Sequence, residues 1–573
     1  MKAAYTTVLI MSILILAPIL HCGGGSGEYF DALTSSVTAP DSIPQSLKFT
    51  DIDPDEDQLT GDLIIQKAAD ESKISTYRVY WGSGESTRLT GQSAITSFTA
   101  DGTDHTYSFA ADTAVPSGAT HLLVYTEGDE GEVITPKAID FDDLVIRIVA
   151  DINPGGSSST PQRFIVFSDR LFFNADDGTH GDELWLSDGS SGGTVLVKDI
   201  NSTTIADPST PWEFTVAGGK LYFTANKAEN GTELWTTDGT AAGTTIVADI
   251  NPGTGDSFIQ NLTEFNGELI FQAQDNPLNG RELWKSDGTT TQMLKDIYIV
   301  TNQSSYPLFF KEFNSKLYFT ATTSAEGQEM WATDGTAPNT ILFEDIYAGA
   351  SDGKPTNYTV CNGKLYFNAN DNTANIELWS TDGTTTAQVR DINPGTNAES
   401  NPQYLTAYNN ILYFSANDGT NGEELWRSDG TATGTIMVKD INTSASSSPA
   451  NLFVVNGLLF FVANDGINGR ELWVTNGTAA GTRMVRDINP SGDGDPGNFI
   501  AYNNLLYFSA TDGVNGYEIW CTDGTEEGTR MTANVNSGGD FIPTAFIVFN
   551  GRLYFGADSG DGNGSELRVL YYK

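Results

Sequence analysis

Residues 391–438 read DINPGTNAESNPQYLTAYNNILYFSANDGTNGEELWRSDGTATGTIMV, and near-copies of this unit fill most of the chain. A Glu-Leu-Trp phrase followed by an Asp-Gly turn marks almost every copy. A fixed period of this length is typical of repeat architectures, in which each unit buries its apolar faces against its neighbours. The tryptophan recurs every 47 to 50 residues, at Trp185, Trp235, Trp284, Trp331, Trp379, Trp426, Trp473 and Trp520.

Each unit contains four short apolar runs, which predict β-strands. In the quoted unit they span residues 404–408, 411–416, 424–427 and 435–439, are rich in aromatic or β-branched residues, and are too short for helices. Asn409-Asn410 separates the first two runs, and Asn-Gly takes this place in four other units. Asparagine and glycine tolerate the positive φ that a type I′ hairpin requires, so these two runs predict a hairpin.

The longest connection joins the fourth run of one unit to the first run of the next, as in residues 393–402. This asymmetry predicts a four-stranded antiparallel meander, then a crossing to the inner strand of the next meander, which is the layout of a β-propeller blade. Residues 144–152 read as an orphan fourth strand, and residues 543–573 supply only three strands. Together they predict a composite blade that closes the ring and leaves no exposed strand edge.

We therefore predict an all-β protein whose residues 143–573 form a many-bladed β-propeller, with nine four-stranded repeats by count. Propellers usually have about four to eight blades. An eight-bladed ring with a displaced terminal unit and an open superhelical array are therefore kept as alternatives.

The repeated phrase resembles the one after which the bacterial ELWxxDGT repeat family is named, and the resemblance covers residues 144–573. Four positions depart from the phrase: Met330 and Ile519 replace the leucine, Asn476 the aspartate, and Arg568 the tryptophan of the last unit. The resemblance implies an exported, propeller-like repeat protein. It implies no reaction.

Acidic residues dominate the charge of the chain. Lysine and arginine number 30 against 74 aspartates and glutamates, which gives a formal net charge of −44. Such a surface repels nucleic acid and anionic lipid headgroups, so we expect no nucleic-acid partner. It attracts cations and basic partners instead.

The N-terminus predicts an export signal. The apolar stretch Val8–Leu20 is too short to span a bilayer and leads to Cys22 and a Gly-Ser segment, so residues 1–21 predict a signal peptide. The arrangement is similar to a bacterial lipoprotein signal with Cys22 as the lipidated residue, although Leu20 and His21 depart from the small residues usual there. An ordinary cleaved secretory signal is the alternative.

This signal predicts a bacterial protein held at the outer membrane or cell surface by its lipid alone, with the periplasmic face as an alternative. Residues 22–45, rich in Gly, Ser, Thr and Pro, predict a flexible tether. Residues 46–142 contain short apolar runs at intervals of about ten residues, which predict a β-sandwich. Trp81 in a central run and the stretch 115–119 before a tyrosine-bearing strand resemble a fibronectin type III or immunoglobulin-like domain.

The residue inventory argues against catalysis. The four histidines are His21, His105, His121 and His180, and only the last lies in the repeats, so a histidine triad or multi-histidine metal site in the propeller is excluded. A pair of glycosidase carboxylates is the alternative, because acids are plentiful. However, these acids recur from unit to unit, whereas an active site needs one asymmetric set. We predict no catalytic residue.

Acidic loops suggest Ca²⁺ as the one candidate cofactor. Carboxylates are the ligands that calcium prefers, but aspartate is also a standard turn former, and no loop has EF-hand spacing. The candidate ligands are a dense run before the second sandwich strand, Asp51, Asp53, Asp55 and Asp57, and the first residue of the loop after the second run of four units, Asp177, Asp418, Asp465 and Asp512.

The eight repeated tryptophans either line sugar-binding pockets or pack between blades. We predict the core role, because large rings fill the widening gap between blades that are buried on both faces. Trp212 falls outside the repeated position and is a better candidate for a surface contact. Cys361 and Cys521 lie in different units and predict buried small apolar residues rather than a disulfide.

These patterns favour a non-enzymatic binding or surface-interaction protein on a propeller scaffold, expected to be monomeric. Its partner would be an unidentified protein or glycan. Two alternatives belong to other classes: a carbohydrate-active hydrolase with a carboxylate site at one propeller face, and a calcium-stabilised structural protein of the envelope.

Overall fold

The computed structural model describes residues 43–49, 58–84, 86–117, 119, 121–128, 131–133, 135–140, 144–202, 207–276, 279–371, 376–395, 398–532, 535–536 and 539–572. Cys22 and the acidic run at Asp51, Asp53, Asp55 and Asp57 lie outside these residues. The chain divides into two compact units: the smaller contains most of residues 43–140, and the larger contains the whole repeat array. Within the described residues, no helix is long and apolar enough to cross a membrane.

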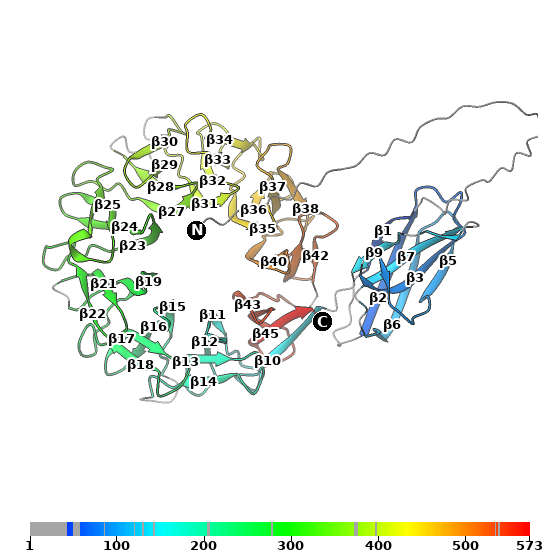
Figure 1. Cartoon of the computed structure of the whole chain (residues 1–573), viewed down its shortest axis with the longest axis horizontal. Coiled ribbons are helices and arrows are strands. Elements are labelled where there is room, and N and C mark those ends of the chain that lie inside the picture. The colour runs from blue at the N-terminus through cyan, green and yellow to red at the C-terminus, as the bar shows by residue number, and fades with distance from the viewer. Residues whose placement is uncertain are drawn as a thin grey trace, which may run out of the picture. The chain divides into compact units, whose positions relative to one another are not determined.

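Strands β1 to β9 form the two antiparallel sheets of a small β-sandwich (Figure 1). One sheet has the order β1-β2-β6 and the other β4-β3-β7-β8, with β5 beside β3 and β9 beside β7. Tyr77, Val79 and Trp81 are buried at alternate positions of β3, as expected of a strand with one covered face. The bounds are β1 (Pro44–Lys48), β2 (Gln58–Ala68), β3 (Thr76–Gly84), β4 (Thr87–Arg88), β5 (Thr96–Thr99), β6 (His105–Ala114), β7 (His121–Gly128), β8 (Gly131–Glu132) and β9 (Lys137–Asp140).

Nine four-stranded antiparallel sheets form the blades of a ring (Figure 1), so the count of nine is confirmed and the eight-bladed and open alternatives are wrong. Blades 1 to 4 comprise β11 (Gln162–Phe167), β12 (Arg170–Asp176), β13 (Asp182–Ser187), β14 (Val195–Lys198); β15 (Trp212–Ala217), β16 (Lys220–Lys227), β17 (Gly231–Thr237), β18 (Thr245–Ala248); β19 (Gln260–Phe265), β20 (Glu268–Ala273), β21 (Glu282–Ser286), β22 (Thr291–Lys295); and β23 (Leu308–Phe313), β24 (Lys316–Thr323), β25 (Gly327–Thr333), β26 (Ile341–Glu344), with a 3-10 turn η1 (Ala337–Asn339) in blade 4.

Blades 5 to 8 repeat the same arrangement. They comprise β27 (Thr356–Cys361), β28 (Lys364–Asn370), β29 (Ile376–Thr381), β30 (Thr386–Arg390); β31 (Gln403–Tyr408), β32 (Ile411–Asn417), β33 (Glu423–Ser428), β34 (Ile436–Lys439); β35 (Ala450–Val455), β36 (Leu458–Asn464), β37 (Arg470–Thr475), β38 (Arg483–Arg486); and β39 (Gly497–Tyr502), β40 (Leu505–Thr511), β41 (Tyr517–Thr522), β42 (Arg530–Met531). The four strands of blade 6 agree with the four predicted runs to within one residue. Asn409 and Asn410 have φ of 51° and 61°, which confirms the predicted hairpin turn.

Blade 9 closes the ring as predicted. It combines β43 (Phe546–Phe549), β44 (Arg552–Asp558) and β45 (Ser565–Tyr572) with β10 (Leu144–Ala150) in the order β10-β45-β44-β43. Innermost strands of neighbouring blades contact one another around the ring, and β43 contacts β11 at the closure. There Thr544 Oγ1 donates a hydrogen bond of 2.8 Å to the carbonyl of Pro161. Both ends of the array are therefore paired.

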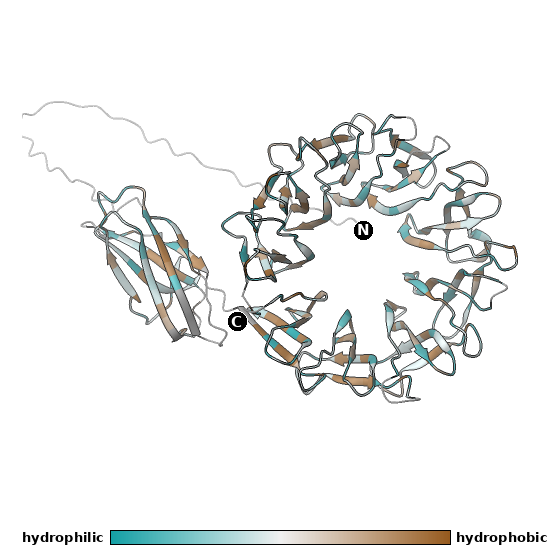
Figure 2. Cartoon of the chain, turned by 180° about the vertical axis from the view of Figure 1, so that it is seen from behind, coloured by the Kyte–Doolittle hydropathy of each residue, from teal (hydrophilic) through white to brown (hydrophobic). Residues whose placement is uncertain are grey.

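The core lies between blades rather than within one layer. Phe223 on β16 belongs to a buried cluster with Phe172 of blade 1, whereas its neighbour Tyr222 belongs to a cluster with Phe271 of blade 3. Because both faces of each blade are covered, the second strand reads as a continuous apolar run rather than an alternating one. Figure 2 shows hydrophobic residues along the strands of the blades and mainly hydrophilic connecting loops.

Candidate functional site

The glutamate of each Glu-Leu-Trp phrase is fully buried and clamps the crossing segment that leads to the next blade. In blade 6, Glu424 Oε2 accepts hydrogen bonds from the Ile441 N–H at 2.9 Å and from Ser447 Oγ at 2.6 Å, and Oε1 accepts one from the Ser447 N–H at 3.0 Å. This repeated acid is therefore structural. The set is Glu183, Glu233, Glu282, Glu329, Glu377, Glu424, Glu471, Glu518 and, in the composite blade, Glu566.

Burial raises the pKa of all nine clamp glutamates, although the hydrogen bonds to each oppose the shift. The pKa reaches about 7 for Glu183, Glu233, Glu329, Glu471 and Glu518. Perturbed carboxyl groups often mark catalytic sites, but here the perturbation accompanies a repeated structural contact. It therefore identifies no single blade as a reaction centre.

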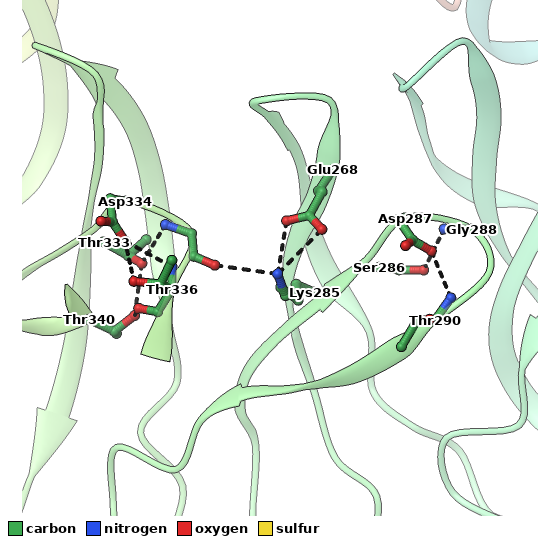
Figure 3. A network of polar contacts seen from close by, with 11 residues as sticks. Glu268, Lys285, Ser286, Asp287, Gly288, Thr290, Thr333, Asp334, Thr336 and Thr340 are labelled. Carbon is green, nitrogen blue, oxygen red and sulfur yellow. Dashed lines mark hydrogen bonds and ion pairs between the residues drawn. The ribbon is translucent and has the colours of Figure 1, made fainter. Parts of the chain in front are cut away.

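The Asp-Gly turn after the tryptophan is also structural. Figure 3 shows two neighbouring copies: Asp287 Oδ1 accepts a hydrogen bond of 2.7 Å from the Thr290 N–H group, and Asp334 Oδ1 accepts one of 2.6 Å from Thr336 Oγ1. Asp287 Oδ1 also accepts a hydrogen bond of 2.7 Å from the Thr289 N–H group. Lys285 lies between the two turns, 3.0 Å from Glu268 Oε2 in its own blade. Its Nζ also lies 3.5 Å from the Gly335 carbonyl oxygen of the next turn. These turns order the loop and link adjacent blades.

The four loop aspartates predicted as calcium ligands accept hydrogen bonds from their own turns. Asp418 Oδ1 accepts N–H hydrogen bonds of 2.9 and 2.8 Å from Thr420 and Asn421, and Oδ2 accepts one of 2.7 Å from Asn421 Nδ2. Asp465 and Asp512 make the same contacts, and Asp177 binds the N–H groups of Thr179 and His180 and the His180 ring. Within the described ranges, no three His, Cys, Asp or Glu side chains are placed to hold a metal ion. These loops fit turns better than a cation site, and calcium stays a prediction.

The repeated tryptophans lie between blades, where Trp379 is half-buried and the other seven are buried. Trp520 Nε1 donates to the Ala510 carbonyl at 3.1 Å. Arg568, which replaces this tryptophan in blade 9, is also buried, and its Nε donates to the equivalent carbonyl of Ala557 at 2.8 Å. Its charge pairs with Asp561 at 3.0 Å, so the departure from the repeat keeps both the bond and the burial. Cys361 and Cys521 are buried free thiols.

Two positions at the start of each innermost strand of blades 1 to 8 carry different residues from blade to blade and are held in the left-handed φ region. One directly follows the clamped serine or its substitute and has φ of 43° to 49° in blades 1 to 8. The other, three residues later, sits at a break in the β-ladder and has φ of 54° to 60°. The first set is Thr160, Thr210, Phe258, Tyr306, Lys354, Asn401, Ser448 and Asp495, and the second is Arg163, Glu213, Asn261, Phe309, Asn357, Tyr404, Asn451 and Asn498.

Exposed aromatic side chains occupy these positions in blades 3, 4 and 6. Phe258, Tyr306, Phe309 and Tyr404 are 42%, 45%, 45% and 47% exposed. Trp212, the predicted surface contact, is 49% exposed beside the second position of blade 2, with the Arg163 guanidinium over its ring. Asparagine tolerates this backbone region, whereas a bulky aromatic residue there is an outlier. Neither burial nor backbone preference therefore explains these aromatic residues.

A pocket of about 500 Å³ opens among the innermost strands of blades 4 to 7. Phe309 and Tyr404 contribute aromatic rings, and Asn357, Gln403 and Asn451 contribute amides. None of the lining residues, all of which are described, carries a formal charge. The remaining lining residues are Phe310, Tyr358, Thr359, Leu405, Thr406 and Leu452.

Hydrogen bonds across blades 5 and 6 orient the amides of the pocket. Asn357 Nδ2 donates to Asn368 Oδ1 at 3.3 Å and, across the blade boundary, to Gln403 Oε1 at 3.2 Å. Gln403 Nε2 in turn donates to Asn401 Oδ1 at 3.0 Å. Thr359 Oγ1 donates to the carbonyl of Leu405 in the next blade at 3.0 Å. These hydrogen bonds fix two of the three pocket amides, Asn357 and Gln403, in place before a ligand binds.

Residue types alone predict none of these pocket residues, because the αL position is occupied by arginine, glutamate, phenylalanine and tyrosine as well as by asparagine. A usable signal exists in the repeats. When the repeats are compared, the position of Phe309 and Tyr404 and the position before it vary, whereas the position after it is always Phe, Leu or Tyr. Variation within an otherwise constant unit marks residues that the scaffold does not require.

Among proteins of known structure, the chain is similar to puromycin hydrolase, with 13% identity over 63% of this chain and 60% of that chain and a TM-score of 0.32. It is similar to a prolyl endopeptidase, with 10% identity over 72% of this chain and 56% of that chain and a TM-score of 0.39. It is also similar to the β-propeller domain of the Trilobed protease from Pyrococcus furiosus, with 9% identity over 67% of this chain and 96% of that chain and a TM-score of 0.26. The chain thus covers less than two thirds of the first two proteins. No protein-family model matches the chain, and no curated protein matches it. Similarities of this size support no conclusion about activity.

Proposed function

We propose that this protein is a non-enzymatic binding protein that holds a glycan in the pocket between Phe309 and Tyr404. The observation that carries the proposal is the placement of these two rings. Each is nearly half exposed and sits in a backbone region that disfavours a bulky side chain. Residues held at such a cost, on the order of 1 kcal/mol each, concentrate at ligand sites.

The polar part of the pocket favours a sugar. The amide of Asn357 still offers its oxygen as an acceptor, because both of its N–H groups are already donated within the protein. Gln403 and Asn451 also line the pocket, and an amide side chain can both donate to and accept from sugar hydroxyls. Exposed rings offer flat apolar surfaces for the C–H faces of a sugar. The pocket itself has no charged lining residue, which suits an uncharged segment of the ligand.

A peptide that adds a strand to the ring is a weaker candidate. Each innermost strand pairs with a neighbour along one edge only, which is the situation that β-strand addition requires. However, the left-handed residues at Phe309, Asn357 and Tyr404 interrupt the free edges of β23, β27 and β31. A regular row of N–H and C=O groups is therefore not presented to an extended peptide.

The hydrolase alternative finds no support at this pocket. Retaining and inverting glycosidases use a pair of carboxyl groups. The lining residues supply no carboxyl group and no histidine. The repeated buried glutamates are engaged in clamps between blades, so they do not provide such a pair.

Binding of neutral oligosaccharides to the full chain tests the proposal. An array identifies the ligand, and calorimetry measures its Kd. Phe309→Ala and Tyr404→Ala should each weaken binding by about 2- to 13-fold, because an aromatic contact contributes about 0.5–1.5 kcal/mol and 1.4 kcal/mol is a factor of ten. The matched control is Ile467→Ala, which truncates an apolar side chain that is 86% exposed on blade 7 outside the pocket. Unchanged affinity in both aromatic variants would refute the proposal.

We also propose that the protein is exported and lipid-anchored through Cys22, as a member of the ELWxxDGT repeat proteins with a fibronectin-like domain before the propeller. The supports are the repeated phrase, the sequence before Cys22 and the two-sheet sandwich. Such an anchor would present the propeller to glycans outside the membrane. Incorporation of labelled fatty acid into the wild type but not into Cys22→Ala tests this; label in both would contradict it.

A further inference from the structure

Arg281 lies in blade 3 directly before β21, against two of the exposed rings described above. The guanidinium carbon is 4.3 Å from the ring centre of Phe258 and 5.7 Å from that of Tyr306. These rings come from blades 3 and 4, whose innermost strands, β19 and β23, are neighbours in the ring (Figure 1). A guanidinium held over ring faces loses none of its N–H donors to them, so these donors can serve a ligand.

The backbone around Arg281 is fixed on both sides. Its N–H donates to Ser304 Oγ at 2.9 Å, and its carbonyl accepts from the N–H groups of Ser305 and Tyr306 at 3.0 and 3.3 Å. The next residue is Glu282, the buried clamp that also binds Ser305. The arginine is thus presented from a rigid junction between two blades, as a binding residue requires.

The repeat supplies an internal comparison for Arg281. Arg470 takes the same place in blade 7, and its Nε lies 3.2 Å from Asp495 Oδ1. Asp495 is the first left-handed residue of blade 8, the position that Tyr306 takes in blade 4. No acid of the described chain forms an ion pair or hydrogen bond with the Arg281 guanidinium. An aromatic residue therefore replaces the acid that neutralises the equivalent arginine.

We propose that Arg281, flanked by Phe258 and Tyr306, binds an anionic group of the ligand, and that this ligand is an acidic oligosaccharide bearing carboxylates. The inference rests on the proposed glycan-binding function and adds the chemical class of the glycan. The guanidinium fork matches a carboxylate in a bidentate pair, and the two rings hold the sugar that carries it. Tyr306 and Phe309 are three residues apart, at most about 11 Å of chain, so one oligosaccharide reaches both this arginine and the neutral pocket.

The net charge of −44 does not prevent this contact. Charges on the surface are screened over a Debye length of about 8 Å at physiological ionic strength, so distant acids act weakly on a bound carboxylate. They do repel an approaching anion, which makes association slower at low salt. The acidic ligand should therefore associate faster as salt rises from low to physiological concentration, the opposite of a ligand attracted by a basic surface.

Paired oligosaccharides test the inference on the full chain. The probes are a panel of tetrasaccharides containing uronic acids and the carboxyl-reduced form of each. The wild type should bind at least one acidic member about 10- to 100-fold more tightly than its reduced form, because a charge-assisted hydrogen bond contributes about 1.5–3 kcal/mol. Arg281→Gln should remove this preference while it leaves affinity for the reduced form unchanged. Arg470→Gln, the matched control, should keep the preference.

The outcomes separate this inference from the proposed function. If tetrasaccharides bind without preference for the acidic form, or if Arg281→Gln keeps the preference, the inference is wrong and the proposed function stands. If no oligosaccharide binds, or an acidic peptide binds more tightly than every oligosaccharide, both are wrong. The melting temperature of Arg281→Gln should stay within about 1 °C of the wild type, because its guanidinium makes no hydrogen bond within the described residues and its contacts with the two rings are partly exposed.

Discussion

Replacing Glu424 with alanine tests the clamp between blades 6 and 7. The Ile441 N–H loses its acceptor, whereas the N–H and Oγ of Ser447 keep the Glu423 carbonyl at 3.0 and 3.3 Å. A buried unpaired donor costs about 1–3 kcal/mol, and the lost charge-assisted bonds to Ser447 add to this, so we expect a loss of about 2–4 kcal/mol of unfolding free energy.

The corresponding change in melting temperature follows from the size of the propeller. At about 2.1 cal/mol/K per residue, a unit of about 430 residues has an unfolding entropy of about 0.9 kcal/mol/K, so Glu424→Ala should lower its Tm by about 2–4 °C. Differential scanning calorimetry of the full chain measures this shift. Glu229→Ala is the surface control, because that side chain is 68% exposed.

Blade 8 offers a graded comparison. Among the described residues, Glu518 accepts hydrogen bonds of 3.2 and 3.3 Å from the Val535 and Asn536 N–H groups, both longer than those of Glu424 to Ile441 and Ser447. Phe541 takes the place at which other blades have serine or glycine. Glu518→Ala should therefore lower Tm less than Glu424→Ala. If Glu424→Ala melts with the wild type and the surface control, the argument that the repeated glutamate holds the blades together fails.

Three further predictions concern the scaffold. Raising the pH from about 5 to about 8 should lower the Tm of the propeller, because burial raises the folded-state pKa of Glu471 from 4.5 to about 7. The stability that this carboxyl group contributes is complete below its unfolded-state pKa and is lost as the pH rises through its folded-state pKa. Calorimetry at constant ionic strength measures the change; a flat or rising Tm would contradict the prediction, and Glu471→Gln should make Tm depend less steeply on pH. In chemical denaturation, Gly430→Ala should lower the free energy of unfolding by about 1–3 kcal/mol more than Gly457→Ala. Both glycines have positive φ, but only at Gly430 would an added Cβ meet a neighbouring blade, at Tyr366 Oη. Equal losses of unfolding free energy in the two variants would contradict this packing argument. A chelator should leave the Tm of the propeller unchanged, because Asp418 and its equivalents already accept the hydrogen bonds of their turns. A large rise in Tm on addition of calcium would contradict this and show that these aspartates bind the ion.

The repeat predicted the fold in detail because local turn chemistry and global closure agree in every unit. The Asn-Gly turns predicted the hairpins, and the long crossing segment predicted where each blade begins and ends. The unpaired strand predicted at residues 144–152 pairs with β45 at the other end of the chain. The four short sandwich strands β4, β5, β8 and β9 escaped prediction, because two to four residues carry too little pattern.

The candidate site was not predictable in the same way. A pocket built from β23, β27, β31 and β35 depends on which side chains neighbouring blades bring together, and on left-handed residues such as Phe309 that have no turn-forming character. Four of the repeated loop aspartates were predicted as calcium ligands because carboxylates are numerous in the repeats. Their repetition is explained instead by the same turn, and that of the buried glutamates by the same clamp, in every blade.

A structure of the protein bound to its highest-affinity oligosaccharide would locate the ligand. We expect density for the sugar between Phe309 and Tyr404, with hydroxyl contacts to Asn357, Gln403 and Asn451. Density on the outer surface of the blades, or on the sandwich alone, would contradict it.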